Sequence, residues 1–530
     1  MMKFKYYFLI LFIVASFSCS KSPTTLPIQS GTIFEKSITI DIGKTFQTMD
    51  GFGASDCWTA NYVGRDWSFD QREAIARLLF SKEIKEGDPE GISLSMWRFN
   101  LGAGTSEQGN ASGIEDQSRR AECFLNEDGT FNWQKQQGQQ FFLEKAHEYG
   151  CNSFVMFSNS PPVYYTFNGK GYSDRGAYSN LKPEHYTDFA LYMANVASYF
   201  KNNKNIPFSY ISPVNEPQYN WDAPSQEGTG WQNKEIKHLA VELDKALTQQ
   251  NLESKILITE SGDWEYLYKS KGNAGRSNQI KEFFSPQSEN YIGDLSHVPP
   301  LIGGHSYWTD GNWNTLSQVR QELASAAASH GLKIYQTEWS MLGDHYNDKD
   351  YPGNETSTYL DIALHMAKVM HHDLTTANVS SWSYWTALDM DRWNHKNRFL
   401  LIKLTPAGGA YGDISQSGSH EAMKNLWVLG NYSLFIRPGY QRIDLNIKNP
   451  SDSFFGSAWL SPSKDKVVIV FTNMTANSLE VALDLKGMSK KHLSIKRYVT
   501  SSRKNLQEDI PKDDICMVDP QSVTTFVLQY

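Results

Sequence analysis

Residues 208–217 read FSYISPVNEP, in which a short β-type run, FSYISPV, is followed at once by an asparagine and a glutamate. The same layout, a short apolar run that ends in polar or aromatic residues, recurs eight times along the chain. The eight runs are FQTMDGFGAS (46–55), ISLSMWRFN (92–100), SFVMFSNSPP (153–162), FSYISPVNEP (208–217), ILITESGDW (256–264), LIGGHSYW (301–308), IYQTEW (334–339) and NVSSWSYW (378–385). This repeated unit decides the fold.

Amphipathic stretches lie between these runs and place apolar residues three and four positions apart, the spacing of a helix with one buried face. They are QREAIARLLF (71–80), WQKQQGQQFFLEKAHEYG (133–150), EHYTDFALYMANVASYF (184–200), EIKHLAVELDKAL (235–247), TLSQVRQELASAAASH (315–330) and STYLDIALHMAKVMHH (357–372). Strand–helix alternation predicts a parallel sheet. Eight units favour a (β/α)8 TIM barrel over an open doubly wound sheet, and GFGAS lacks the third glycine of a dinucleotide fingerprint. The predicted class is α/β, with the barrel over residues 45–425.

The pattern changes after about residue 425, where runs alternate apolar and polar residues with turns between them. These runs are VVIVFTNMT (467–475), LEVALDLKG (479–487), LSIKRYVTS (493–501) and SVTTFVLQY (522–530). This signature predicts an antiparallel β-sandwich appended to the barrel. The strand-like SITIDI (37–42) precedes the barrel and would join it, so we assign residues 37–44 and 426–530 to this side domain.

The first residues, MMKFKYYFLILFIVASFSCS, have the layout of a secretory signal: two lysines, a short apolar run, and small residues before Cys19. The Ser-Phe-Ser-Cys end resembles a bacterial lipoprotein signal, in which the cysteine becomes the lipidated first residue; ordinary signal-peptidase cleavage is the alternative. We expect a signal peptide over residues 1–18 and a Ser/Thr/Pro-rich tether over residues 19–36. The protein would be exported to the surface or periplasm of a bacterium, with a lipid on Cys19 in the outer membrane.

Charge and composition exclude several classes of partner. The net charge is −8 at pH 7, and removal of residues 1–18 with their two lysines would make it −10. No block of Lys and Arg is present, so nucleic acid is not an expected partner. Beyond the N-terminus no stretch is long and apolar enough to span a membrane. Cys57, Cys123, Cys151 and Cys516 show no zinc spacing and are expected to be mostly buried thiols, so no metal or cofactor is predicted.

The carboxyl ends of the eight runs carry the candidate site, because reacting groups of (β/α)8 barrels lie at that end. The polar and aromatic residues there are Asp50, Arg98, Asn159, Asn215, Glu216, Glu260, His305, Tyr307, Glu338, Trp382 and Trp385. Glu216 and Glu338 end the fourth and seventh runs. Two carboxylates, one protonated and one ionised, are what glycosidic cleavage needs, and their proximity would raise one pKa. Taken singly, NEP could be a surface turn, and TEW a helix cap or an ion pair.

Glu260 also ends a strand-like run, the fifth, and is an alternative nucleophile or a structural or sugar-binding residue. His365, His371 and His372 lie on one helical stretch without the H-E-x-x-H spacing of a zinc site. We interpret them as surface or packing residues.

The motifs GFGAS, WRFNLGAG, SNSPP, PVNEP, HSYW, QTEW, WSYW and LGNYSLFIRPG, taken in this order, resemble glycoside hydrolase family 30, from about residue 37 to the C-terminus. The resemblance implies Glu216 as acid/base and Glu338 as nucleophile, in a double displacement through a glycosyl-enzyme intermediate. It implies that Asn215 contacts the sugar 2-hydroxyl, that Arg98 orients the nucleophile, and that Tyr307 lies beside it. The further substrate contacts expected are Asn159, His305 and Trp382, the last as the floor of the cleft. Alternatively, Arg98 could pair with a structural acid and Trp382 could be core.

Two stretches, SNSPPVYYTFNGKG and NEPQYNWDAPSQEGTGW, look most like the endo-β-1,6-galactanase branch, in which a Gln-Glu-Gly follows the catalytic loop. This likeness adds Glu227 as a substrate contact, and the aromatic residues that could stack on sugars are Tyr164, Tyr165, Trp221, Trp231 and Trp308. The predicted function is retaining, endo-acting cleavage of β-1,6-galactosidic linkages in plant arabinogalactan. The alternatives are a β-1,6-glucanase or (glucurono)xylanase of the same family, and a non-catalytic carbohydrate-binding protein. The oligomeric state is not predicted.

Overall fold

The computed structural model describes residues 34–529 except 344–350, 393–395, 397, 488–492 and 510–515. Residues 33–530 form one compact unit. The predicted signal peptide, Cys19 and most of the tether lie outside the described residues. The tether was predicted to end too late, because residues 34–36 already belong to strand β1 (Phe34–Thr48).

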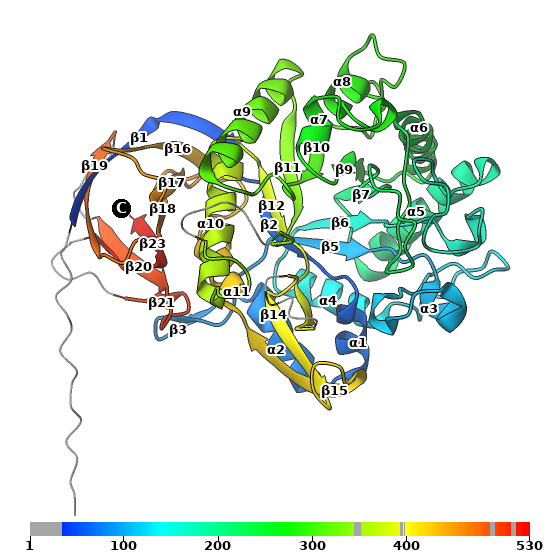
Figure 1. Cartoon of the computed structure of the whole chain (residues 1–530), viewed down its shortest axis with the longest axis horizontal. Coiled ribbons are helices and arrows are strands. Elements are labelled where there is room, and N and C mark those ends of the chain that lie inside the picture. Colours follow the sequence, from blue (N-terminus) through cyan, green and yellow to red (C-terminus); the bar gives the residue numbers. More distant parts are fainter. Residues whose placement is uncertain are drawn as a thin grey trace, which may run out of the picture. The chain divides into compact units, whose positions relative to one another are not determined.

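A parallel sheet with the strand order β8-β7-β6-β5-β2-β12-β11-β10-β9 forms the centre of the molecule (Figure 1). Its strands are β2 (Gly51–Ser55), β5 (Met96–Asn100), β6 (Ser153–Phe157), β7 (Tyr210–Ser212), β8 (Lys255–Ile256), β9 (Thr259–Ser261), β10 (Leu301–His305), β11 (Lys333–Trp339) and β12 (Ser381–Tyr384). The two end strands, β8 and β9, are successive pieces of one run of chain. β8 pairs with β7 at one end of the strand order, and β9 pairs with β10 at the other end. The first and last strands of the order therefore come from the same predicted run. The eight predicted runs therefore form a curled, TIM-like parallel sheet.

Helices alternate with the strands and lie around the sheet in Figure 1, as their amphipathic patterns predict. They are α1 (Thr59–Asp66), α2 (Phe69–Phe80), α3 (Thr105–Gln108), α4 (Gln137–Glu148), α5 (Tyr186–Tyr199), α6 (Asn233–Gln249), α7 (Glu265–Tyr268), α8 (Gln279–Phe284), α9 (Trp313–Ser329), α10 (Tyr359–Thr375) and α11 (Lys424–Ser433). Capping boxes fix the starts of α6 and α10, where Gln232 with Glu235 and Thr358 with Asp361 satisfy the first backbone N–H groups. The three histidines of α10 serve packing, as expected: the His371 ring lies 4.7 Å from that of Phe455, and His365 and His372 are buried.

Alternation along the strands separates an apolar layer from the candidate site. Met96, Val155, Leu301 and Tyr335 of four strands, with Leu257 from the link between β8 and β9, form a small cluster apart from the main core. Successive residues of a strand point to opposite faces, so Arg98 shares the face of Met96 one step further toward the carboxyl end. The polar side chains of the strand ends thus lie above a closed apolar layer.

A second sheet has the strand order β21-β20-β23-β18-β17-β16-β1-β19-β22. Its further strands are β16 (Gln441–Ile447), β17 (Phe454–Leu460), β18 (Lys466–Asn473), β19 (Leu479–Lys486), β20 (Ser494–Thr500), β21 (Gln507–Glu508), β22 (Cys516–Val518) and β23 (Ser522–Gln529). β1 pairs antiparallel with β16 and parallel with β19, which joins the two ends of the described chain in one sheet.

The second sheet is buried on both faces of its central strand. In β18, Val467, Ile469 and Phe471 belong to a cluster confined to this sheet, whereas Val468 and Val470 belong to the main core. Both faces of β18 are therefore apolar, and one of them packs against the main core. A separate β-sandwich domain with the predicted boundaries stays a proposal.

Segments not foreseen from the sequence include β16, β17 and a small sheet of β13 (Leu388–Met390), β14 (Ile402–Ala407) and β15 (Asp413–Ala422). Strands β14 and β15 form an antiparallel hairpin that follows the last barrel strand. Among the described residues, no helix is long and apolar enough to cross a membrane. Cys57, Cys123 and Cys151 are buried thiols, as expected.

Candidate active site

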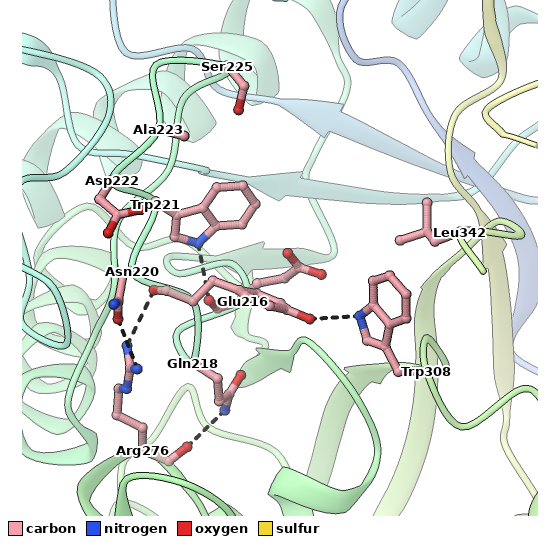
Figure 2. Close-up of a pocket in the computed structure, with 11 residues that line it drawn as sticks. Glu216, Gln218, Asn220, Trp221, Asp222, Ala223, Ser225, Arg276, Trp308 and Leu342 are labelled. Carbon is pink, nitrogen blue, oxygen red and sulfur yellow. Dashed lines mark hydrogen bonds between the residues drawn. The ribbon is translucent and has the colours of Figure 1, made fainter. Parts of the chain in front are cut away.

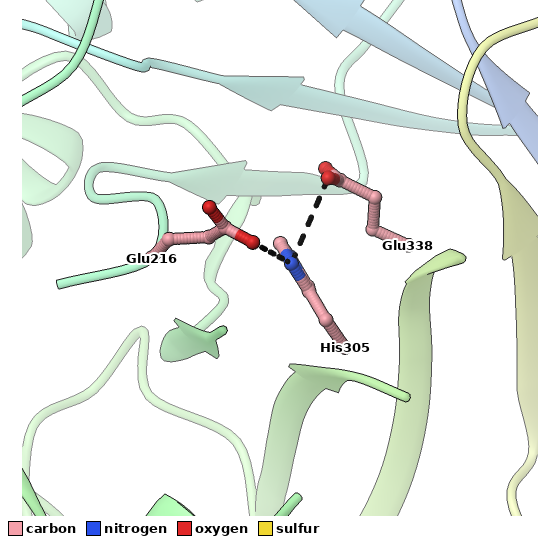
Figure 3. Close-up of side chains that lie close together, drawn as sticks. All are labelled: Glu216, His305 and Glu338. Atoms are coloured by element: carbon pink, nitrogen blue, oxygen red, sulfur yellow. Dashed lines mark hydrogen bonds and ion pairs between the residues drawn. The ribbon is translucent and has the colours of Figure 1, made fainter. Parts of the chain in front are cut away.

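The carboxyl ends of five β-segments bring together five charged side chains. Arg98 lies in β5, Glu260 in β9, His305 at the end of β10, Glu338 in β11, and Glu216 four residues after β7. All five are at least nine-tenths buried. Figure 3 shows Glu216 and Glu338 on either side of His305, with their carboxyl groups turned toward its ring. The strand-end rule thus placed these residues correctly.

Two hydrogen-bond donors hold the carboxyl group of Glu338. The Arg98 Nη1 atom donates a hydrogen bond to Glu338 Oε2 at 2.7 Å, and the Tyr307 hydroxyl donates to Glu338 Oε1 at 3.0 Å. The Arg98 guanidinium is fixed in turn by Ser55 at 3.0 Å and lies 3.8 Å from the centre of the Phe157 ring. Two donors on its two oxygens fix the orientation of the Glu338 carboxyl group.

His305 connects three glutamates through its two ring nitrogens. Nδ1 lies 3.0 Å from Glu216 Oε1 and 3.7 Å from Glu338 Oε1, and Nε2 lies 3.1 Å from Glu260 Oε2. Burial disfavours the charged ring, but the neighbouring carboxylates, Glu338 first, outweigh it and raise the pKa of His305 to about 10. His305 is therefore an imidazolium at neutral pH and donates from both nitrogens. It was predicted to contact substrate; its ring is instead fully buried and bound to protein carboxylates.

The surroundings of Glu216 and Glu260 shift the pKa values of these two residues in opposite directions. Burial is the largest cause that raises the pKa of Glu216, with the Glu338 charge adding to it while His305 and Arg98 act against it. Burial also favours neutral Glu260, but Arg98 and His305 outweigh it and lower the pKa of Glu260 to about 2. Two cations thus face three glutamates, and a single proton makes the group neutral. Of Glu216 and Glu260, it is Glu216 whose pKa is raised, which makes Glu216 the candidate proton donor.

One oxygen of Glu216 and one oxygen of Glu338 lie within 4.8 Å of each other. A carboxylic acid and a carboxylate at this separation can act on the same atom of a ligand, one as proton donor and the other as nucleophile or charge stabiliser. Glu216 is 8 % exposed and lines a pocket, whereas Glu260 is completely buried.

Three asparagines extend the polar site away from Arg98. Arg98 Nη2 donates to Asn215 Oδ1 at 3.3 Å, Asn215 Nδ2 donates to Asn159 Oδ1 at 3.0 Å, and Asn159 Nδ2 donates to Asn100 Oδ1 at 3.2 Å. The predicted residues Asn215 and Asn159 are therefore brought together with the charged group. Asn100 was not singled out from the sequence, although it ends the second predicted run.

A pocket of about 550 Å³ opens beside Glu216 (Figure 2). Trp308 is 55 % exposed, and its indole N–H donates to the Tyr219 hydroxyl at 2.7 Å. The Trp221 indole N–H donates to the Glu216 carbonyl oxygen at 3.2 Å. A side chain at Gly228 would lie 2.4 Å from the Trp221 ring, so only glycine fits there. The lining residues are Glu216, Gln218, Tyr219, Asn220, Trp221, Asp222, Ala223, Ser225, Arg276, Trp308 and Leu342.

The structure does not place Trp382 on the floor of the cleft. Its ring is fully buried, packs against Trp339, and donates its indole N–H to Asp373 at 3.0 Å. Three positions later, Trp385 takes the opposite side of the chain and lies 5.8 Å from the Arg98 guanidinium. The alternative interpretation of Trp382 as core is the one that the structure supports, and Trp385 is the ring beside the charged group.

Glu227 is likewise not a lining residue of the pocket. It is 1 % exposed, and its carboxylate accepts hydrogen bonds from Ala103 N at 3.0 Å and Thr105 Oγ1 at 2.6 Å. Burial raises the pKa of Glu227 to about 7. It fastens the loop after β5 instead of presenting oxygens to a ligand. Trp231, predicted to stack on sugars, is also buried in the main core.

Among the described residues, Glu216, His305 and Glu338 are the group whose ligand atoms lie close enough to hold a metal ion. The donor set does not fit a cation, because an imidazolium has no lone pair to offer and both its nitrogens already bind carboxylates.

Comparison with known proteins agrees with this geometry. The model of O-glycosyl hydrolase family 30 matches residues 35–400. An endo-β-1,6-galactanase of Hypocrea rufa is 23% identical over 456 residues, which cover 83% of this chain and 81% of that protein. A glucuronoxylanase of Bacillus subtilis is 24% identical over 410 residues, covering 75% and 78% of the two chains. The crystal structure of a conserved exported protein from Bacteroides fragilis superposes with a TM-score of 0.85 at 30% identity, covering 93% of this chain and 100% of that one. The chain is an O-glycosyl hydrolase and belongs to glycoside hydrolase family 30.

Proposed function

We propose that this protein is a retaining, endo-acting glycosidase that cleaves β-1,6-galactosidic linkages in arabinogalactan-type polysaccharide. Glu338 is the nucleophile and Glu216 the acid/base in this proposal. The observation that carries it is the separation of at most 4.8 Å between an oxygen of Glu216 and an oxygen of Glu338. Carboxyl groups about 5–5.5 Å apart are typical of retaining enzymes, whereas inverting enzymes leave room for a water molecule between them.

The two steps follow from the protonation states of the site. Glu338 attacks the anomeric carbon and forms an ester bond, while the glycosidic bond breaks and Glu216 gives its proton to the departing oxygen. A water molecule then attacks the same carbon, Glu216 takes up the water proton, and the Glu338 carboxylate leaves. Arg98 and Tyr307, which donate to the two oxygens of Glu338, stabilise its anionic form before and after each turnover.

The substrate assignment rests on the named relatives and on the aromatic walls of the pocket. The Hypocrea rufa relative is an endo-β-1,6-galactanase and spans most of this chain. Trp221 and Trp308 supply ring faces on which the apolar faces of pyranose rings can stack. The glucuronoxylanase of Bacillus subtilis, of similar identity, makes glucuronoxylan the second candidate substrate. Export by an N-terminal signal with a lipid on Cys19, and a side domain of residues 37–44 and 426–530, complete the proposal.

A substrate panel with a nucleophile variant tests this function. The protein and its Glu338→Gln variant are incubated with β-1,6-galactan, β-1,6-glucan and glucuronoxylan, and the released oligosaccharides are analysed. We expect short galacto-oligosaccharides from β-1,6-galactan alone. With the variant, the rate of their release should be lower by about 10⁴-fold or more. Products from glucan or xylan would keep the chemistry and change the substrate. Binding without any product would favour a carbohydrate-binding protein.

A further inference from the structure

The pocket beside Glu216 continues into a second pocket of about 560 Å³, here called the middle pocket, which is lined in part by Arg119, Arg398 and Phe399. Ala223 and Ser225 line both pockets. On the other wall, Leu342 of the first pocket accepts a hydrogen bond through its carbonyl oxygen from Arg398 Nη2 at 3.1 Å. In Figure 2, Leu342 lies on the opposite side of the view from Ala223 and Ser225. The two pockets therefore adjoin: they share lining residues on one wall, and a hydrogen bond links a residue of each on the other.

A third pocket of about 530 Å³, here called the distal pocket, continues the same groove. Glu115, Asp116 and Arg392 line both the middle and the distal pocket. The far side of the distal pocket is formed by Tyr411 and Asp413 at the turn of the β14–β15 hairpin. The three pockets thus form one groove that begins at Trp308 and Glu216 and ends at Tyr411.

Tyr411 combines high exposure with a fastened backbone. Its side chain is 67% exposed, the largest exposed fraction among the large apolar and aromatic residues that the structure describes as exposed. Arg392 Nε donates to the Ala410 carbonyl oxygen at 2.6 Å, and Arg392 Nη2 donates to the Gly412 carbonyl oxygen at 3.3 Å. The residues on both sides of Tyr411 are therefore tied to the same guanidinium. Because the turn is already fixed, a ligand that covers this exposed ring loses little affinity to the conformational entropy of ordering the protein.

The charges beside Tyr411 suit neutral sugars. Glu115, Asp116 and Asp413 line the distal pocket with Arg392 as the one described cation. The hydroxyl of Ser415, which donates to Asp413 at 2.7 Å, lowers the pKa of Asp413, so this carboxylate is ionised at neutral pH. Carboxylates accept hydrogen bonds from sugar hydroxyls, whereas a uronic acid would meet a net negative charge here.

We propose that the distal pocket at Tyr411 is a remote subsite for neutral hexose units of the same glycan chain that reaches Glu216 and Glu338. This inference rests on the proposed glycosidase function and adds a second point of attachment, far along the groove from the scissile bond. It makes affinity for long chains depend on a residue outside the catalytic site.

A comparison of long and short substrates tests the remote subsite. Tyr411→Ala is compared with Tyr178→Ala. Tyr178 is also an exposed tyrosine, at 50%, but it lines none of the three pockets. With long β-1,6-galactan, we expect Tyr411→Ala to raise KM about 5- to 10-fold. The rise with a trisaccharide should be much smaller, and Tyr411→Phe, which keeps the ring, should restore most of the affinity for the polymer. Equal effects on long and short substrates, or equal effects of the two alanine variants, would overturn the inference.

Failure of the subsite and failure of the proposed function give different results. In the Glu338→Gln background, binding of galactan, glucan and xylan is measured by calorimetry with and without Tyr411→Ala. A neutral polymer other than galactan that binds through Tyr411 would refute the substrate and support the subsite. If galactan is cleaved, and if Tyr411→Ala changes neither its cleavage nor its binding, the proposed function is supported and the subsite is refuted. No binding of any of the three polymers would refute both.

Discussion

Glu216 and Glu260 are the most instructive pair of positions in the molecule, because their local surroundings start out alike. Each lies where a barrel strand ends, and each has a left-handed backbone, with φ of 42° and 51°. Each carboxyl group contacts one nitrogen of the same imidazole, at 3.0 and 3.1 Å. The two are even joined directly, since Glu216 N donates to the Glu260 carbonyl oxygen at 2.8 Å.

What separates the two glutamates is the second partner of each. Glu260 lies 3.3 Å from Arg98 and accepts a hydrogen bond from the Thr337 hydroxyl, and no part of it reaches solvent. Glu216 has the Glu338 carboxylate as its further neighbour and lines the pocket. Glu260 is thereby an anion at neutral pH beside His305, whereas burial and the Glu338 charge raise the pKa of Glu216. Residue type and strand position select candidates, but the nearest charges assign the roles.

The largest effect within this comparison is expected for Glu216→Gln. Loss of the proton donor should lower kcat/KM for the polysaccharide by about 10²- to 10⁴-fold. For an aryl glycoside whose phenolate leaves without protonation, the loss in the first step should be far smaller. Steady-state kinetics with both substrates measure the difference. An equal loss on both would show that Glu216 is not the proton donor.

A smaller effect is expected for Glu260→Gln, which removes a negative charge from His305 without changing the size of the side chain. Since Glu260 touches no pocket, we expect kcat to fall about tenfold through His305, with little change in KM. The pKa of His305 should drop from about 10, since one of the carboxylates that raise it is gone. Titration of the imidazole by NMR and the pH profile of kcat measure both. If the pKa of His305 stays at its wild-type value while kcat falls, Glu260 has a purely structural role.

Stability should depend on pH through His305 and Glu260, in opposite directions. The pKa of His305 is raised from 6.5 to about 10, so its stabilising contribution is complete below pH 6.5 and is lost as the pH rises through 10. The pKa of Glu260 is lowered from 4.5 to about 2, so its contribution is complete above pH 4.5 and is lost as the pH falls toward 2. Thermal unfolding of the wild type and His305→Gln should therefore differ most below pH 6.5 and converge toward pH 10. A constant difference from pH 5 to pH 10 would contradict the assigned charge of His305.

The sequence predicted the barrel well because each strand is a short apolar run with a helix pattern after it. All eight runs contain strands, and the run 256–264 is divided between β8 and β9, a break that its continuous apolar pattern does not reveal. Strand β16, QRIDLNI, was missed because charged residues interrupt it, and its pairing with β1 is a contact between residues about 400 positions apart. Such a pairing leaves no local signal.

The candidate site was predicted as a set of residues more successfully than as a set of roles. The strand-end rule found Arg98, Glu216, His305 and Glu338 together, as the structure has them. It failed for Trp382, because β12 pairs with β2 in a regular register and alternation places Trp382, with Tyr384, on the face that packs into the main core. Only the three-dimensional arrangement shows that the His305 ring is buried among three glutamates.

The smallest effect is expected for Glu227→Gln, which is also the matched control for Glu260→Gln, since both residues are buried glutamates on the chain segments that follow barrel strands. Glu227 binds only the loop at Ala103 and Thr105, so the amide should keep one acceptor, lose the other, and destabilise the fold by about 1–2 kcal/mol. With both the polymer and short oligosaccharides, kcat/KM should stay within about threefold of wild type. Thermal unfolding and steady-state kinetics on one preparation separate the two quantities. A KM raised tenfold or more at unchanged stability would restore Glu227 as a substrate contact, and would mean that the loop it fastens opens when a glycan binds.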